Sequence, residues 1–238
     1  MTGTAEAHVD RHRHADVSGG WLRAAVFGAM DGLVSNIALI AGVGGAGVAA
    51  GTVLLTGTAG LVAGAISMAL GEYTSVRTQG EQVAAELAKE RRELERHPDE
   101  EIAELAQAWI ARGLPADLAH EVARAVHANP EEALRLHARE ELGVDPDEQP
   151  SPWTAAVSSF VCFAVGAFIP LLPYLFGSTV LWPALVAGGA GLFAAGALFA
   201  RFTRLPWWLA GPRQLLLGAA AAGATYLIGM LIGTATAA

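Results

Sequence analysis

One carboxylate stands inside a long apolar segment near the start of the chain. Asp31 lies within residues 21–50, which carry no other charge after Arg23. An aspartate at the centre of a membrane-spanning helix costs about 2.5–3.5 kcal/mol, so such residues usually face a bundle interior or a conduit and serve a function. Asp31 is therefore a candidate for binding a cation inside a membrane. The alternative is a hydrogen-bond anchor between two helices.

Two further candidate ligands lie near the end of the next apolar segment, residues 52–76. Met68 and Glu72 are one helical turn apart there. A thioether sulfur favours Fe2+ over Mg2+, which prefers oxygen ligands. A carboxylate that holds either a proton or a metal ion is the minimum device for coupling their opposite movement. Asp31 and Glu72 thus form the carboxylate pair of a predicted cation pathway, unless Glu72 reaches the membrane surface. From the residues alone, Met68 is better explained by packing against lipid or core, and its place in the pathway depends on the family resemblance given below.

The polar stretch after residue 76 is strongly acidic. Between Glu81 and Glu148 it carries 18 acidic and 8 basic residues, so its net charge of −10 exceeds the −8 of the whole chain. Glutamates one turn apart put like charges on one helix face, which is unfavourable unless something compensates. Two such acidic turns, separated by a break at Pro98, can fold toward each other and share a cation. The candidate metal ligands of this stretch are Glu90, Glu93, Glu101, Glu104, His137 and Glu141.

The chemistry of these donors indicates which cation they would hold. Carboxylate oxygens suit hard divalent ions, and a nitrogen donor such as that of His137 shifts the preference toward transition metals. A solvated acidic face without metal is the competing interpretation, because helices of soluble domains often carry acids, especially in the first turn.

The apolar residues form five windows, each long enough to span a bilayer as a helix. With 53% hydrophobic residues, we predict an all-α integral membrane protein with five transmembrane helices and a small helical cytosolic metal-binding domain inserted between spans 2 and 3. All 15 lysines and arginines lie in residues 11–23, 77–139 and 201–213, which five spans place on the cytosolic side. The predicted parts are a disordered cytosolic tail at 1–20, transmembrane helices 1 and 2 at 21–78, the cytosolic domain at 79–151 and transmembrane helices 3–5 at 152–238.

Helix boundaries in the insert follow from proline and glycine. Pro98, Pro115 and Pro130 each mark a helix start, and Gly143 ends the last helix. Nothing breaks the helix before Arg96, so we expect the second span to continue into the insert. The small core of the insert is predicted to contain Leu105, Trp109, Ile110, Leu118, Val122 and Val126.

Glycine and proline also predict how the spans pack. Gly28 and Gly32 stand at four-residue spacing, which allows a neighbouring helix to approach closely. Pro170 and Pro173 predict a kink in the third span, because proline removes backbone hydrogen bonds.

Other classes of function are disfavoured by what the sequence lacks. The single cysteine, Cys162, makes a disulfide framework or a cysteine metal cluster implausible. None of the seven histidines lies in a span, which argues against an intramembrane hydrolase, and the Glu-x-x-His pairs of di-iron oxidases are absent. No phosphate-binding glycine loop or nucleic-acid motif is present. We therefore expect no enzymatic activity, no prosthetic group and no nucleic-acid partner.

Several long runs closely resemble the vacuolar iron transporter family. They are LRAAVFGAMDGLVSN at 22–36, GLVAGAISMALGEYTSV at 60–76, the stretch 129–143 and IPLLPY at 169–174. The resemblance covers nearly everything from residue 20 onward. It implies a five-helix homodimer in the lipid bilayer that moves Fe2+, and often Mn2+, out of the cytosol in exchange for protons. The implied pathway lies between the two first spans.

The resemblance also implies roles for individual residues. Asp31 matches the membrane aspartate of the family, and Met68 matches its membrane methionine. His137 stands where the plant branch of the family carries methionine, so the donor changes from sulfur to nitrogen. Met30 replaces the asparagine that many bacterial relatives carry before the Asp-Gly pair. The positions that match the family's cytosolic metal site by spacing are Glu90, Glu93, Glu101, Glu104 and Glu141.

Together these features predict a divalent-metal (Fe2+/Mn2+) transporter that exports its ion from the cytosol by proton antiport. A membrane-anchored divalent-metal sensor that binds without transport is the alternative. The short tail and brief loops favour a bacterial plasma (inner) membrane, with the N-terminus and residues 79–151 in the cytosol.

Overall fold

The computed structural model describes residues 20–202 and 205–236, and every regular element in these ranges is helical. Five helices are long and apolar enough to cross a membrane: Gly20–Gly45, Ala50–Arg96, Pro152–Leu175, Trp182–Phe202 and Trp207–Ala235. The prediction of an all-α chain with five candidate spans is confirmed. Of the predicted tail, residues 1–19 lie outside the described ranges, and Gly20 already belongs to the first helix.

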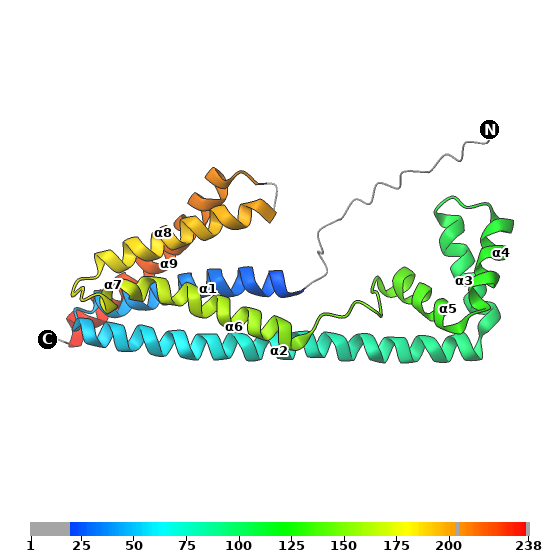
Figure 1. The fold of residues 1–238 in the computed structure, drawn as a ribbon, viewed down its shortest axis with the longest axis horizontal. Coiled ribbons are helices and arrows are strands. Elements are labelled where there is room, and N and C mark those ends of the chain that lie inside the picture. Colours follow the sequence, from blue (N-terminus) through cyan, green and yellow to red (C-terminus); the bar gives the residue numbers. More distant parts are fainter. Residues whose placement is uncertain (1–19, 203–204, 237–238) are drawn as a thin grey trace, which may run out of the picture.

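The helices form two groups (Figure 1): an apolar bundle, and the short helices α3 to α5 at the far end of α2. The first span ends earlier than the predicted 21–50, because a turn that contains Gly47 at φ +76° separates it from the second. The elements are α1 (Gly20–Gly45), α2 (Ala50–Arg96), α3 (Pro98–Ala111), α4 (Ala116–His127), α5 (Pro130–His137), η1 (Ala138–Leu142), α6 (Pro152–Phe168), η2 (Ile169–Leu171), α7 (Leu172–Leu175), α8 (Trp182–Phe199), η3 (Ala200–Phe202) and α9 (Trp207–Thr236).

Helix α1 is the central helix of the apolar bundle and packs against α6, α9, α2 and α8. Its glycines let α6 approach at backbone distance. A Cβ at Gly28 would lie 2.7 Å from the Ser159 carbonyl oxygen, and one at Gly32 would collide with the Phe163 carbonyl. The close approach predicted from the spacing of these glycines is confirmed, and it fixes the position of α1 within the bundle.

The third span changes its helix type where the two prolines stand. Helix α6 ends at Phe168, and the short 3-10 turn η2 and the single turn α7 continue the span through Pro170 and Pro173. Asn36 of α1 is buried, and its Nδ2 donates a hydrogen bond of 2.5 Å to the Ala167 carbonyl oxygen beside this break. The predicted interruption of the span is confirmed, and an α1 side chain satisfies one of the carbonyls next to it.

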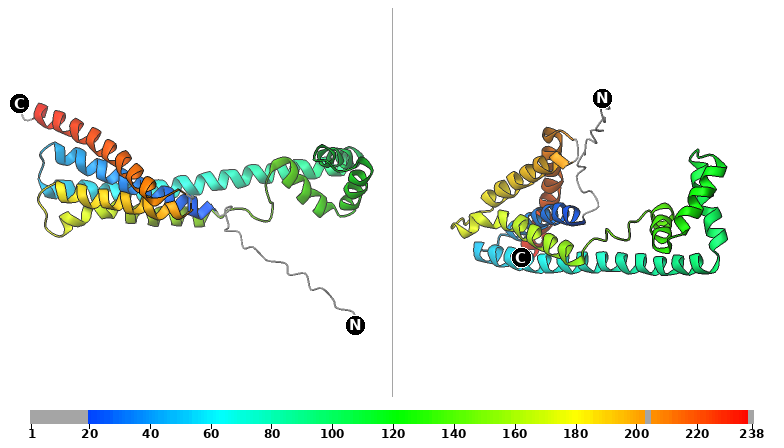
Figure 2. Two further views of the ribbon diagram at one scale, coloured as in Figure 1. Left: turned by 90° about the horizontal axis from the view of Figure 1, so that it is seen from above. Right: turned by 45° about the vertical axis from the view of Figure 1, so that its right-hand side comes forward.

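Helix α2 connects the bundle to the insert without interruption. It has 47 residues, which corresponds to a length of about 70 Å at 1.5 Å per residue. Figure 1 shows it extending from the bundle to the short helices at the far end, and both views in Figure 2 show the same arrangement. The prediction that the second span continues as one helix to Arg96 is confirmed.

The helices of the insert start where the prolines predict. Helix α3 begins at Pro98 and α5 at Pro130, while α4 begins directly after Pro115. Asn129 caps α5, because its side-chain oxygen accepts hydrogen bonds from two backbone N–H groups of the first turn, at 3.2 and 3.5 Å. Gly143 ends η1 in the left-handed conformation at φ +65°.

The core of the insert differs from the prediction. Leu105 is buried, and Trp109 and Ile110 pack against it as expected, but Leu118 is 47% exposed. Leu118, Val122 and Val126 instead line a surface groove, so their assignment to the core was wrong. Small side chains take their place and allow α3 and α4 to pack closely; they are Ala106, Ala119 and Ala123.

Candidate metal centre

Four predicted ligands meet in the insert. Glu90, Glu101, His137 and Glu141 each offer one ligand atom, and these atoms all lie within 4.8 Å of one another. The Nδ1 atom of His137 lies 2.7 Å from Glu141 Oε1, 3.1 Å from Glu90 Oε1 and 3.6 Å from Glu101 Oε2. The His137 side chain is fully buried. We call these four residues the metal centre.

Four elements contribute to the metal centre, and two of them, α5 and η1, follow each other directly. Glu90 lies on α2 and Glu101 in the first turn of α3, after the chain reverses at Pro98. His137 ends α5, and Glu141 follows one turn later in η1, a π-helical turn. Such wider turns are rare and often occur at functional sites. The arrangement therefore depends on how α2, α3 and α5 dock.

Two ion pairs outside the metal centre hold these elements in register. Arg91 of α2 contacts Glu131 of α5 with N–O distances of 3.1 and 3.3 Å. Arg112, directly after α3, forms an ion pair with Glu140 of η1. Both pairs have at least one partner exposed to solvent, so each contributes little stability by itself. Their effect is to orient the helices that carry the ligands.

The electrostatics of the metal centre favour a cation. Burial and the charge of Glu141 raise the pKa of Glu90 from 4.5 to about 7, and His137 partly opposes this shift. Burial also raises the pKa of Glu101 above its ordinary value. Glu90 Oε1 is buried and accepts no hydrogen bond, although His137 Nδ1 lies 3.1 Å away. A divalent ion would compensate both the burial and the mutual repulsion.

Two of the six predicted ligands lie outside this group. Glu93 and Glu104 are each three residues from a member of the metal centre, and neither contributes an atom to it. They remain close enough for their charges to act, because Glu104 raises the pKa of Glu90 and both raise that of Glu101. Because positions three apart on a helix are offset by nearly one turn along its axis, Glu93 and Glu104 lie one turn away from Glu90 and Glu101. Their role as direct ligands stays a prediction.

A second histidine, which the sequence analysis did not select, lies against the metal centre. The Nε2 atom of His127, at the end of α4, is 3.3 Å from the Nε2 atom of His137. The two rings are perpendicular, with centroids 5.2 Å apart. His127 and His137 belong to different helices, so no periodic pattern along the sequence links them. The only sequence signal was the presence of a histidine near a predicted site.

The three predicted membrane residues occupy different surroundings. Asp31 accepts a hydrogen bond of 2.8 Å from Ser35, its neighbour on α1. Met68 is half-buried and packs against the α2–α6 contact around Phe163. Glu72 is buried, with 8% of its side chain exposed, and pairs with Arg23 at 2.8 Å. The sequence analysis did not predict this ion pair, which joins α1 to α2.

Asp31 and Glu72 do not meet in the described part of the chain. Arg23, which contacts Glu72, precedes Asp31 by eight residues on α1, or about 12 Å along the helix. The two carboxylates therefore lie at different depths and do not form one site within a single chain.

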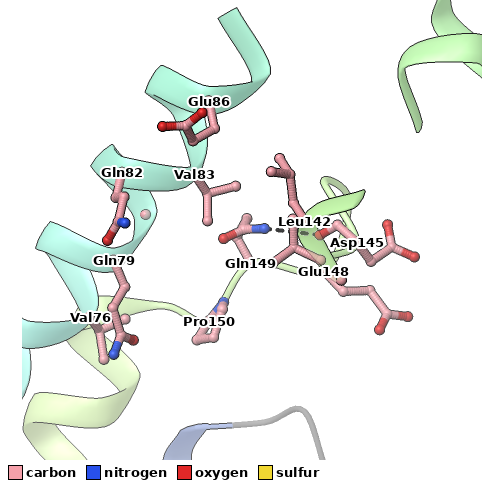
Figure 3. Close-up of a pocket in the computed structure, with 13 residues that line it drawn as sticks. Val76, Gln79, Gln82, Val83, Glu86, Leu142, Asp145, Glu148, Gln149 and Pro150 are labelled. Atoms are coloured by element: carbon pink, nitrogen blue, oxygen red, sulfur yellow. Dashed lines mark hydrogen bonds between the residues drawn. The ribbon is translucent and has the colours of Figure 1, made fainter. Parts of the chain in front are cut away.

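A cavity of about 530 Å3 lies beside α2, along the part of this helix between Glu72 and the metal centre (Figure 3). One wall is the face of α2 from Val76 to Glu86, and the other is the segment 142–150 that leads to α6. Gln149 Nε2 donates a hydrogen bond of 2.9 Å to the Asp145 carbonyl oxygen in that segment. Amides and carboxylates on both walls make the cavity suitable for water and for a hydrated cation.

Comparison with known proteins places the chain in a family. The model of the VIT family matches residues 22–230. A vacuolar iron transporter from Acanthamoeba castellanii is 39% identical over 202 residues, which cover 79% of this chain and 74% of that protein. Vacuolar iron transporter 1 from Oryza sativa subsp. japonica is 32% identical over 222 residues (92% and 87%), and that from Tulipa gesneriana is 30% identical over 225 residues (93% and 90%). The family resemblance predicted from the motifs is confirmed, and the chain belongs to the VIT family.

Proposed function

We propose that the protein is a divalent-metal transporter that moves Fe2+ or Mn2+ out of the cytosol in exchange for protons. The observation that carries this proposal is the metal centre, in which three carboxylates and one imidazole offer ligand atoms within 4.8 Å of one another. The names of the relatives, vacuolar iron transporters, support iron as the transported ion. Manganese and proton coupling are the more specific parts of the proposal.

The donor set of the metal centre determines which ions it can capture. Three carboxylates provide the hard oxygen ligands that Mn2+ and Fe2+ accept, and the His137 nitrogen disfavours Mg2+ and Ca2+ relative to these transition metals. Deprotonation of Glu90, whose pKa is about 7, accompanies binding, so capture releases a proton near neutral pH. We assign capture of the cytosolic ion to this centre.

Movement across the bilayer is assigned to Glu72, Met68 and Asp31. Glu72 is paired with Arg23, so an arriving cation competes with the guanidinium for the carboxylate. Met68 follows one turn further along α2 and offers a thioether, which prefers Fe2+ to Mg2+. Asp31 lies deeper in the bundle and can hold either the ion or a returning proton. The same carboxylates then serve both directions of exchange.

A homodimer completes this pathway. Asp31 and Ser35 lie on a face of α1 that also carries Phe27, which is 56% exposed. In a single chain this face would present a carboxylate to lipid, which is costly. A second copy packed through α1 would enclose the two aspartates between protein surfaces, so we propose that α1 lines the dimer interface.

The orientation follows from the positive-inside rule. Basic residues of the described ranges gather on α2 from Arg77 onward, in the insert and near the ends of α1, α8 and α9. Under the positive-inside rule, this distribution supports a cytosolic N-terminus and cytosolic residues 79–151. The relatives are named for the vacuole, so the bacterial plasma membrane expected from the short loops has no support from them and stays a prediction.

Proteoliposomes containing the purified full-length protein test the proposal. A metal-responsive dye and a pH dye report on the two ions during addition of Fe2+, Mn2+, Co2+ or Zn2+. We expect Fe2+ or Mn2+ flux accompanied by opposite proton movement. Metal binding without flux would contradict transport and would favour the metal sensor. Metal flux without proton movement would contradict antiport alone.

A further inference from the structure

His127 lies behind His137, on the side opposite the carboxylates. The Nδ1 atom of His137 faces Glu141, Glu90 and Glu101 at 2.7–3.6 Å. Its other nitrogen, Nε2, lies 3.3 Å from Nε2 of His127. The remaining nitrogen of His127, Nδ1, is 2.8 Å from the Ala123 carbonyl oxygen. A continuous chain of contacts thus runs from the helix α4 backbone to the metal centre.

The Ala123 carbonyl oxygen fixes the direction of one hydrogen bond in this chain. A carbonyl oxygen can only accept, so Nδ1 of His127 must carry the hydrogen that reaches Ala123. A neutral His127 then has a lone pair on Nε2, which can accept a hydrogen bond from His137. Two nitrogens in contact need one hydrogen between them. When a metal ion takes the place of a hydrogen on Nδ1 of His137, that hydrogen belongs to Nε2 of His137, and His127 accepts it.

We propose that His127 is a positioning residue that holds His137 as an Nε2–H donor and so makes Nδ1 the nitrogen that binds the metal ion. The proposal rests on the metal centre of the proposed function and adds a residue to it. Histidine ligands commonly donate their second ring nitrogen in this way, which fixes both the tautomer and the ring orientation.

The packing of α4 makes His127 a rigid support. Ala123 and Ala119, one and two turns before His127, are fully buried against α3, the helix that also carries Glu101. His127 and Glu101 are therefore placed by the same pair of helices. A displaced His127 would leave the Nε2–H of a fully buried His137 without an acceptor, which is unfavourable.

Three substitutions at two positions separate this role from simple packing. His127→Phe keeps an aromatic ring but removes the acceptor, whereas His127→Gln keeps a side-chain oxygen that can accept from His137. His120→Phe is the matched control, since His120 is a half-buried histidine two turns earlier on α4 and is not in the metal centre. His137→Ala tests the metal centre itself. All are made in the full-length protein, and thermal midpoints verify folding.

The first measurement is Mn2+ and Co2+ affinity by calorimetry. We expect His127→Phe to weaken binding about 10- to 100-fold, as for other residues that support metal ligands. His127→Gln should recover most of that loss, and His120→Phe should bind like the wild type. If His127→Phe binds as tightly as the wild type while His137→Ala does not, the positioning role is refuted and the metal centre stands. If the wild type and His137→Ala bind alike, the metal centre itself is refuted.

The second measurement identifies the ligating atom without any change at His127. In protein labelled with 15N-histidine and loaded with 113Cd2+, scalar coupling should appear at Nδ1 of His137, and its Nε2 should carry a proton. Among the signals of the seven histidines, those of His137, His127 and His120 are identified by their loss in the His137→Ala, His127→Phe and His120→Phe variants. Coupling to Nε2 of His137, or to either nitrogen of His127, would overturn the proposal.

Discussion

Replacing Glu90 with glutamine tests whether the metal centre is destabilised by its own charges when no ion is bound. Burial, together with Glu141, Glu101 and Glu104, raises the pKa of Glu90 from 4.5 to about 7, and His137 only partly opposes this. The Glu90 side chain is 14% exposed, so solvent screens it little. The difference between the two pKa values corresponds to on the order of 3 kcal/mol.

The sign of this contribution follows from proton linkage. The folded protein binds the Glu90 proton more tightly than the unfolded chain does, so the contribution of Glu90 to stability is fully present below pH 4.5. It is lost as the pH rises from 4.5 to about 7. Glutamine has the shape of a protonated glutamate and does not titrate. Metal-free Glu90→Gln should therefore become more stable than the wild type between pH 5 and pH 8.

Thermal midpoints of the metal-free, full-length protein at pH 5 and pH 8 measure this effect. The difference between Glu90→Gln and the wild type should be larger at pH 8. Glu86→Gln is the matched control, because Glu86 is exposed on α2 one turn earlier and lies outside the metal centre. If Glu90→Gln and Glu86→Gln respond equally to pH, the assignment of a buried, repelled carboxylate at Glu90 is refuted.

Metal binding should reverse the order of stability. At pH 8, Mn2+ should raise the midpoint of the wild type more than that of Glu90→Gln, since the variant has lost one anionic ligand. From pH 7 to pH 6 the wild-type affinity should fall about fivefold through the Glu90 proton, because the pKa of Glu90 is about 7, and the variant should lack this component. Calorimetry in buffers of different ionisation enthalpy counts the released protons. Equal proton release by both proteins would contradict the prediction.

Three further substitutions test the bundle and the pathway. Asp31→Asn should reduce metal-coupled proton flux in proteoliposomes to background while leaving Mn2+ affinity of the purified protein unchanged; normal flux would exclude Asp31 from the pathway. Met68→Leu keeps the apolar packing but removes the sulfur, so Fe2+ flux should fall relative to Mn2+ flux, and an unchanged ratio would contradict a ligand role. Gly32→Ala should cost about 1–3 kcal/mol, because the new Cβ meets the Phe163 carbonyl; the thermal midpoint measures this. Gly71→Ala, where nothing lies within 4 Å of an added Cβ, is its control.

The features predicted correctly from the sequence are those that local residues determine. The five spans follow from the length of the apolar windows, and the starts of α3, α4 and α5 follow from Pro98, Pro115 and Pro130. The uninterrupted α2 follows from the absence of any helix-breaking signal before Arg96. Each of these depends on neighbours within a few turns, so no knowledge of the tertiary contacts was needed.

The features missed from the sequence depend on contacts between distant segments. Alanines rather than Val122 and Val126 form the α3–α4 contact, because the closeness of two helices depends on how both dock. The pairing of Arg23 with Glu72 joins residues 49 positions apart. His127 supports His137 from another helix. Glu90, Glu101, His137 and Glu141 were selected from the acidic pattern and the family spacing, and the fold brings them within 4.8 Å of one another; their role as metal ligands stays a prediction.

The geometry of α2 limits how the metal centre and the membrane pathway can cooperate. Glu72 and Glu90 lie on this one continuous helix, 18 residues apart, so they are separated by about 27 Å along its axis. No side chain spans that distance, and an unbroken helix cannot shorten it. In the proposed pathway, an ion captured by the metal centre must therefore dissociate and cross water before it meets Glu72, beside the cavity between α2 and residues 142–150. Tight binding would slow that release, so the metal centre serves transport best by concentrating ions near the entrance at moderate affinity. The carboxylates of the metal centre are buried and repel one another, and near pH 7 a proton competes with the ion for Glu90. Both effects lower the affinity for the ion and so favour its release.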